Sequence, residues 1–194
     1  MIKKIMCGVI AFTFMCIANV TTSKASVNYG TYITPKIGYS FYTGDYITGH
    51  GSKSVKSGTS SFGGGVSVGY DFIHFFDMPV RVELEYMMKA DANFEVDKRT
   101  MKMPCPKTLL ANVFFDYHNT TDFVPYLMAG AGMSFIDTDS NFAWNVGAGL
   151  KYNFTENTAA DFSVRYVDYG WYKYNQYSTN LTSIDTTLGL SYTF

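Results

Sequence analysis

Apolar and polar residues alternate along this chain with a period of two, which is the pattern of β-strands that have one apolar and one polar face. The segment 80–90 shows it most sharply, because Val82 and Leu84 alternate with Glu83 and Glu85. Eight segments carry the alternation, and their ranges are 33–42, 62–72, 80–90, 108–117, 124–135, 142–154, 160–169 and 184–194. Strands of about ten residues are long enough to cross a bilayer as a barrel. The pattern predicts an all-β fold: an eight-stranded antiparallel up-and-down transmembrane β-barrel.

The connections between these segments alternate in length. The long polar ones are 43–61, 91–107 and 170–183, and the short ones, which carry turn residues, are 73–79, 118–123 and 155–159. Only the segment 136–141 is short where a long loop is due. Long loops on one side and short turns on the other are typical of bacterial outer-membrane barrels, with both ends of the barrel on the periplasmic side.

The composition decides which face of the barrel points outward. Aromatic residues make up 18% of the chain, and on the apolar face they gather at both ends of the segments, with small aliphatic residues between them. Two aromatic girdles around an aliphatic belt are expected of a surface that contacts lipid. Glycine falls on the other face, for example at Gly65, Gly130 and Gly147. Because the interior of an eight-stranded barrel is crowded, glycine makes room there for long side chains, so the polar face is predicted to line the lumen.

A network of buried charges is therefore expected inside the barrel. Unpaired buried charges are very unfavourable, so these bases and acids must pair with one another. We expect Arg165 to be held by inward carboxylates. The lumen network is predicted to consist of Lys36, Asp71, Arg81, Glu83, Glu85, Lys89, Asp116, Lys151, Asp161, Arg165 and Asp185.

The first 25 residues have the pattern of a secretory signal. Lys3 and Lys4 precede an apolar run, 5–18, and a small-residue site that ends at Ala25. We expect residues 1–25 to be cleaved and residues 26–194 to form the barrel. Of the three cysteines only Cys105 would remain, which excludes an internal disulfide and a Cys-x-x-Cys metal site. The remaining chain would be acidic, so nucleic acid is not an expected partner.

Four strings in the chain resemble the opacity-protein and outer-membrane-protein-A type of eight-stranded barrel. They are LANVFFDY (110–117), VPYLMAGAGMSF (124–135), NVGAGLKYNFTENTAADFSVRYVDYG (145–170) and TTLGLSYTF (186–194). The resemblance implies a surface barrel in contact with outer-membrane lipid and lipopolysaccharide. It also implies that Phe194 is a signal for the barrel assembly machinery. No peptidoglycan-binding domain is expected, so a role in tethering the cell wall is not implied.

The long loops are the candidates for function, because binding residues concentrate on loops that a rigid scaffold holds. A structural and adhesive role is predicted, in which the loops bind a host surface or matrix protein, as the resemblance to surface antigens implies. The candidate binding residues are Trp171, Tyr172, Tyr174, Tyr177, Lys98 and Arg99, of types that are common in binding hot spots or carry charge.

Two other functions remain open. A narrow porin-like channel is possible in principle, although an eight-stranded interior is just wide enough to be filled by side chains. A lipid A modifying enzyme is the third alternative, since His50 and Ser52, with Asp45 nearby, offer a base and a nucleophile. These residues lie in a Gly/Ser-rich segment that does not fix their geometry, so no catalytic residue is assigned. No cofactor is expected.

Overall fold

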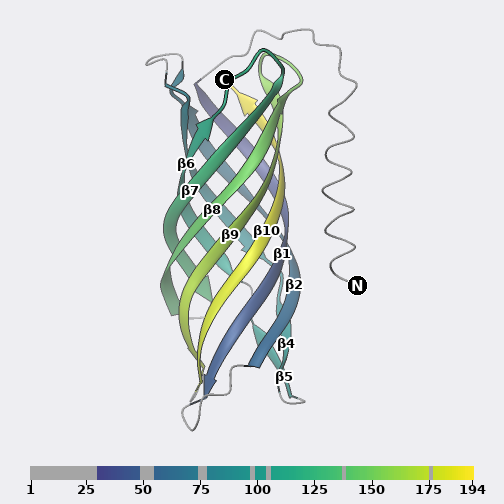
Figure 1. Cartoon of the computed structure of the whole chain (residues 1–194), viewed down its shortest axis with the longest axis vertical. Helices are drawn as coiled ribbons and strands as arrows, with labels where there is room; N and C mark the ends of the chain where they lie inside the picture. The colour runs from purple at the N-terminus through teal and green to yellow at the C-terminus, as the bar shows by residue number, and fades with distance from the viewer. Residues whose placement is uncertain are drawn as a thin grey trace.

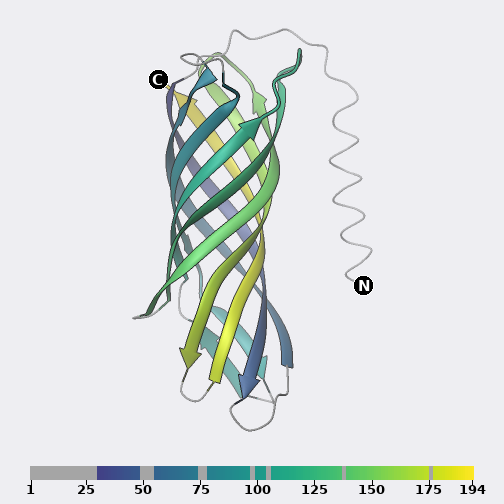
Figure 2. The same cartoon turned by 60° about the vertical axis from the view of Figure 1, so that its left-hand side comes forward.

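The fold follows the predicted alternation. The computed structural model describes residues 30–48, 55–73, 78–96, 99–103, 106–136, 139–174 and 177–194. Eight strands close into one antiparallel barrel in the order β1-β10-β9-β8-β7-β6-β3-β2, and two more form a separate hairpin, β4-β5 (Figures 1 and 2). The predicted eight-stranded antiparallel barrel is confirmed. The strands are β1 (Thr31–Thr48), β2 (Val55–Asp71), β3 (Val80–Lys89), β4 (Ala92–Val96), β5 (Arg99–Met103), β6 (Lys107–Asp116), β7 (Phe123–Ile136), β8 (Asp139–Asn153), β9 (Thr158–Tyr174) and β10 (Tyr177–Thr193).

The two ends of the barrel differ. At one end, here called the turn end, β6 and β7 are joined by residues 117–122 and β8 and β9 by residues 154–157. Phe194 also lies there, and its backbone N–H donates to the carbonyl of Thr31 at 3.1 Å. The opposite end, here called the hairpin end, carries the β1–β2 and β9–β10 connections and the β4–β5 hairpin (Figure 1). Among the described residues, no helix has the length and apolar character needed to cross a membrane.

The outer surface of the barrel is apolar, and its interior is polar. In β3 and β6 the side chains alternate strictly between buried and exposed along the strand. Leu84, Val113 and Leu127 lie in the middle of the outer surface and are all more than half exposed. Aromatic side chains border this aliphatic belt at both ends. Exposed aromatic residues near the hairpin end are Phe41, Phe62, Tyr86, Phe142, Trp144 and Tyr166, and those near the turn end are Phe115, Tyr117, Phe154, Tyr192 and Phe194.

The long loops expected at the hairpin end are largely strands, which corrects the sequence-based prediction. β1 and β2 extend into the segment 43–61, and β9 and β10 extend into 170–183 until only residues 175–176 separate them. The segment 91–107 contains the β4–β5 hairpin. These extensions pair with one another in the sheet, and their sequences lack the clear alternation from which strands are predicted. The short connection expected at 136–141 is confirmed, because β7 ends at Ile136 and β8 begins at Asp139.

A β-bulge interrupts the pairing of β9 with β10. Asp168 pairs with Thr182 and Trp171 pairs with Asn180, so Tyr169 and Gly170 together lie opposite a single residue of β10. Gly170 has a φ of 82°, which an L side chain rarely adopts, and its N–H donates to Oδ1 of Asp168 at 2.8 Å. An extra residue reverses the alternation of a strand beyond it. As a result Tyr169 is buried in the interior, whereas Trp171, two residues later, is 54% exposed.

Candidate functional site

The structure places all eleven residues of the predicted lumen network inside the barrel. Each of the side chains is at least nine-tenths buried. Nine of them take part in ion pairs within 4 Å, divided between two groups. The central charge cluster consists of Lys36, Glu83, Glu85, Lys89, Arg165 and Asp185, and the Arg81 cluster consists of Arg81, Asp116 and Asp161.

The central charge cluster links opposite walls of the barrel. The Lys36 ammonium on β1 donates to Glu83 and, at 2.9 Å, to Oε2 of Glu85, both on β3. The other oxygen of Glu85 lies 2.7 Å from a terminal nitrogen of Arg165 on β9. Asp185 on β10 accepts from the Lys89 ammonium at 2.5 Å and also lies 3.8 Å from Nε of Arg165. Alternating charges of this kind neutralise one another and cross-link strands that are not neighbours in the barrel.

The Arg81 cluster lies nearer the turn end and is enclosed by aromatic rings. The guanidinium donates twice to the Asp116 carboxylate, from Nε at 2.6 Å and from a terminal nitrogen at 3.0 Å, and lies 3.9 Å from Asp161. This fork geometry is the strong form of an arginine–carboxylate pair. The ring centroids of Phe114 and Tyr126 lie 4.5 and 5.1 Å from the guanidinium carbon, close enough for cation–π attraction.

Two tyrosines of this region lie across glycines. Tyr32 pairs with Gly69, and Tyr126 pairs with Gly149. A Cβ atom added to either glycine would come 2.3 Å from the ring carbon that bears the tyrosine hydroxyl. Each ring therefore fills the space that glycine leaves, and Tyr126 donates from there to Asp161 at 2.5 Å. Sequence reasoning placed the glycines inside, but it did not identify the tyrosines that cover them.

Two predicted members of the network stand apart from the ion pairs. Among the residues that the structure describes, neither Asp71 nor Lys151 has an ion-pair partner within 4 Å. Asp71 is the last residue of β2, and its carboxylate accepts the N–H of Ile73 at 3.1 Å. Lys151 pairs in register with Val124 and Asp161 near the turn end. The two residues lie close to the mouth of the barrel rather than in its centre.

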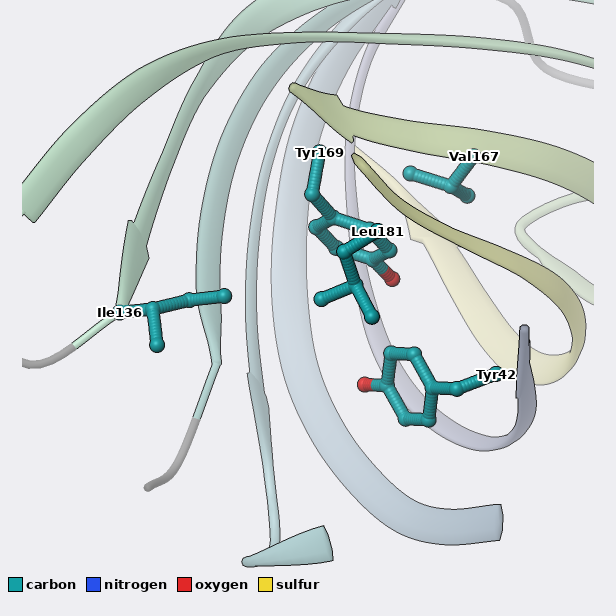
Figure 3. Close-up of a cluster of buried hydrophobic side chains, with 5 residues drawn as sticks. All are labelled: Tyr42, Ile136, Val167, Tyr169 and Leu181. Carbon is teal, nitrogen blue, oxygen red and sulfur yellow. The ribbon is translucent and has the colours of Figure 1, made fainter. Parts of the chain in front are cut away.

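An apolar cap closes the interior at the hairpin end, and sequence reasoning did not predict it. Figure 3 shows its five buried side chains, Tyr42, Ile136, Val167, Tyr169 and Leu181. Tyr42 and Tyr169 are fully buried, with their ring centroids 5.8 Å apart, and the Lys89 ammonium below donates to the Tyr169 hydroxyl. The sequence offered one sign of this cap, because Tyr42 falls on the face of the segment 33–42 that was predicted to line the lumen. Leu181, however, falls in a segment that was expected to be a polar loop.

The candidate binding residues that the structure describes belong to two different hairpins at the hairpin end. Trp171, Tyr172 and Tyr174 lie in β9 beyond the bulge, and Tyr177 is the first residue of β10. Arg99 is the first residue of β5, so it belongs to another hairpin, and Lys98 lies outside the described residues. The register pairs Tyr174 with Tyr177 and thus brings the tyrosines together on adjacent strands.

The described part of the chain offers no arrangement for metal chemistry. Within it, no group of three or more His, Cys, Asp or Glu side chains is placed to hold a metal ion. Asp45 pairs in register with Asn180 and Lys56, whereas His50, Ser52, Cys105 and the predicted signal segment lie outside the described residues.

Replacing Arg165 with leucine tests the central charge cluster. We expect Arg165→Leu to lower the free energy of unfolding by about 2 kcal/mol, because Glu85 and Asp185 each lose a charged partner while Lys36 and Lys89 still neutralise them. Thermal unfolding in detergent would show this as a lower midpoint than that of the parent barrel. An unchanged melting curve would contradict the role given to Arg165.

Comparisons with known proteins agree with this architecture. Residues 8–194 match the model of the outer membrane protein beta-barrel domain family. The outer membrane protein PagN of Salmonella typhimurium is 28% identical, over 89% of this chain and 93% of its own length. The 25 kDa outer-membrane immunogenic protein of Brucella abortus is 27% identical, over 79% of this chain and 78% of its own length.

Solved structures show the same fold at lower sequence identity. The crystal structure of Neisserial surface protein A has a TM-score of 0.57 and 18% identity, and the match covers 85% of this chain and 97% of that one. The outer membrane protein OprG from Pseudomonas aeruginosa has a TM-score of 0.52 and 14% identity, over 88% and 99% of the two chains. The family match spans nearly the whole chain and agrees with the apolar outer surface and charged lumen. The chain is therefore a bacterial outer-membrane protein of the outer membrane protein beta-barrel domain family.

Proposed function

We propose that this barrel is a surface protein that binds a host or environmental macromolecule through its hairpin end. The observation that carries the proposal is the extension of β1, β2, β9 and β10 beyond the outer aromatic girdle as one hydrogen-bonded sheet. Binding residues are effective when a rigid scaffold holds them, because little conformational freedom is then lost on binding. Trp171, a residue type common in hot spots, is 54% exposed on this extension.

The filled interior supports a surface role over solute passage. The central charge cluster and the apolar cap occupy the lumen one above the other, and their side chains are almost completely buried. A permeation path would need these contacts to separate. Measurements of conductance in planar bilayers distinguish the two functions, and open-channel steps at the single-molecule level would favour the narrow channel instead.

Shortening the β9–β10 hairpin tests the proposed function. Because Trp171 pairs directly with Asn180, residues 172–179 can be replaced by the dipeptide Asn-Gly, which closes a two-residue turn between them. In a non-adherent bacterial strain that displays the parent barrel, we expect this replacement to reduce adherence to cultured epithelial cells or to immobilised matrix protein at least severalfold.

The control for this experiment is a change at the other end of the molecule. Glu156→Ala alters an exposed residue at the turn end, so adherence should not change. Folding of each variant is checked by heat-modified mobility in electrophoresis. Equal adherence of the parent and the shortened barrel would overturn the proposed function.

We also propose that Phe194 is read during assembly and that the girdle contacts lipopolysaccharide. The Phe194 side chain is 74% exposed and packs edge-on against Tyr192, with ring centroids 5.4 Å apart. An exposed terminal ring adds little to folded stability, so it is available for recognition by the barrel assembly machinery.

Phe194→Ala separates recognition from stability. We expect the variant to reach the outer membrane in reduced amount in cells, while the refolded protein unfolds in vesicles at the same denaturant concentration as the parent. Quantitative blotting of membrane fractions measures the first quantity and urea titration the second. A normal yield in cells would argue against a role in assembly.

A further inference from the structure

The pairing between β1 and β10, which lie side by side in the barrel wall, has a gap (Figure 1). Ile33 pairs with Tyr192 and Lys36 pairs with Gly189, but the register assigns no partner in β10 to residues 34–35. Elsewhere in the described part of the barrel, only the bulge of β9 interrupts the pairing of neighbouring strands. The gap is therefore a property of the contact between the first and last strands of the barrel.

A proline accounts for the gap. The N–H and C=O groups of a strand residue point to the same neighbouring strand, and the direction alternates from one residue to the next. The carbonyl of Thr31 accepts a hydrogen bond from Phe194, so Pro35, four residues later, also faces β10. Proline has no N–H. It therefore cannot donate to the carbonyl of Leu190, which the register places opposite it.

Another proline of the barrel wall does not have this effect. Pro125 lies in β7, and its carbonyl accepts the N–H of Tyr117 at 2.8 Å. Tyr117 lies beyond the end of β6, so the missing N–H of Pro125 points past the last pair of that ladder. Pairing of β6 with β7 is accordingly unbroken from Lys107 to Asp116. A proline interrupts the wall only where it faces the inside of a ladder, as Pro35 does.

The gap lies in the part of the wall that faces lipid. Pro35 is exposed on the outer surface, and Leu190 beside it is 53% exposed. Along the two strands they lie between Phe41 of one aromatic girdle and Tyr192 of the other. Lipid offers no hydrogen bonds, so backbone groups in a membrane depend on partners within the protein. A carbonyl without its backbone donor weakens the contact between the two strands at this depth.

On the lumen side a side-chain hydrogen bond crosses the gap. The hydroxyl oxygens of Thr34 and Ser191 are 2.7 Å apart, and both side chains are buried. Ser163 and Thr187 form a similar buried pair between β9 and β10, with hydroxyl oxygens 2.6 Å apart. There the backbone pairing is complete, because the same two residues are partners in the register. The two hydroxyl pairs thus differ mainly in whether a backbone ladder supports them.

Toward the turn end, only a short stretch of pairing between β1 and β10 remains. It consists of the pairs Tyr32–Thr193 and Ile33–Tyr192, followed by the hydrogen bond from the N–H of Phe194. Over the same length β1 is paired without a break to β2, and β10 is paired without a break to β9. The two strands can therefore separate here while each stays in the sheet through its other neighbour.

We propose that β1 and β10 separate locally at Pro35 in the membrane-inserted barrel and form a slit that admits small apolar molecules from the lipid to the Thr34–Ser191 pair. Local openings of this kind occur where few hydrogen bonds must break. The ion pair of Lys36 with Glu83, part of the central charge cluster, closes the lumen beyond the slit. The slit is thus a lateral opening rather than a path through the barrel, and it is independent of the proposed surface binding.

Thiol labelling in lipid vesicles tests the slit. Ser191→Cys lies beside the gap, and Ser163→Cys lies beside a complete ladder. Each is made in the full-length chain with serine in place of Cys7, Cys16 and Cys105. The probe is N-phenylmaleimide, which dissolves in lipid and adds the thiol across its double bond. We expect Ser191→Cys to react about tenfold faster than Ser163→Cys, because one fewer backbone hydrogen bond opposes the opening.

Pro35→Val restores the missing donor and so should close the slit. We expect the labelling rate of Ser191→Cys to fall to that of Ser163→Cys in this background. Pro125→Val is the matched control and should leave both rates unchanged. The charged, membrane-impermeant reagent methanethiosulfonate ethylsulfonate distinguishes the slit from the mouth at the turn end. If it shows the same preference for Ser191→Cys over Ser163→Cys, the thiol is reached through the mouth and the slit is wrong.

Amide hydrogen exchange provides a measurement on the parent barrel that needs no substitution. Because the direction of the N–H groups alternates from Phe194 backward, the N–H of Leu190 faces β1 and that of Ser191 faces β9. The two neighbouring amides therefore report on different ladders at the same depth. We expect the protection factor of Leu190 to be about tenfold lower than that of Ser191. Equal protection of the two amides, or labelling of Ser191→Cys that Pro35→Val does not slow, would overturn the proposal.

Discussion

Arg81→Met is expected to lower the free energy of unfolding by about 3–5 kcal/mol, the range found when one partner of a buried ion pair is removed. Arg81 is 1% exposed, and its fork holds Asp116, with Asp161 3.9 Å away. Methionine fills a similar volume but leaves two buried carboxylates without their cation. It also removes the cation–π contacts with Phe114 and Tyr126. Urea titration of the barrel in lipid vesicles, followed by tryptophan fluorescence, measures the change.

A double variant distinguishes the loss of charge balance from the loss of packing. Replacing both partners of a buried pair by apolar residues is often nearly neutral, so Arg81→Met with Asp116→Leu should recover much of the stability lost by the single change. Asp161 keeps its hydrogen bond from Tyr126 in both variants. A single variant as stable as the parent would contradict the account of the Arg81 cluster, and so would a double variant that is less stable than the single one.

Gly149→Ala is expected to destabilise the barrel by about 3 kcal/mol in total, from overpacking together with the loss of a hydrogen bond to a carboxylate. The new Cβ atom would lie 2.3 Å from the Tyr126 hydroxyl oxygen and 2.4 Å from the backbone oxygen of Phe162. The ring would have to move, and the Tyr126–Asp161 hydrogen bond would be lost with it. Urea titration in vesicles measures this change as well.

Gly64→Ala is the matched control, because it adds the same methyl group to a glycine of the outer face. The nearest atom to a Cβ at Gly64 is the carbonyl oxygen of Lys36, 3.5 Å away, which is ordinary contact. We therefore expect a change within about 0.5 kcal/mol of the parent, the size usual for surface substitutions. Equal effects of the two alanines would show that Tyr126 does not depend on the space above Gly149.

The sequence was a good guide wherever one face of a strand meets lipid. In β3, Val82 and Leu84 are exposed on the outer surface while Glu83 and Glu85 are buried, as the alternation predicted. The constraint is strong because a shift of one residue would move every charge of the strand to the lipid side. The same constraint placed the eleven charged residues in the lumen, although it did not assign the partner of each, which depends on the barrel's stagger.

Beyond the membrane no face of a strand has to meet lipid, so this constraint is absent. The sequence-based prediction was less accurate there, because it placed loops where the strands continue. The extensions of β1 and β10 consist largely of Gly, Thr, Ser, Asn and Tyr, so their composition was typical of a loop. Gly170 was one glycine among many, and only the register reveals that the bulge there turns Trp171 outward. The apolar cap was missed for the same reason, because Leu181 and Tyr169 meet through a bulge that no local pattern announces.

The pairing of β1 with β10 closes the barrel. It pairs Tyr32 with Thr193 at one end and Thr48 with Tyr177 at the other, so its partners come from opposite ends of the barrel sequence. Such distant pairing is slow to form, because a long stretch of chain must be ordered before the contact is made. Until the ring closes, β1 and the last strand added both have unpaired edges that attract other chains. The yield of folded barrel is therefore expected to depend on how fast the ring closes relative to aggregation, rather than on the stability of the finished barrel.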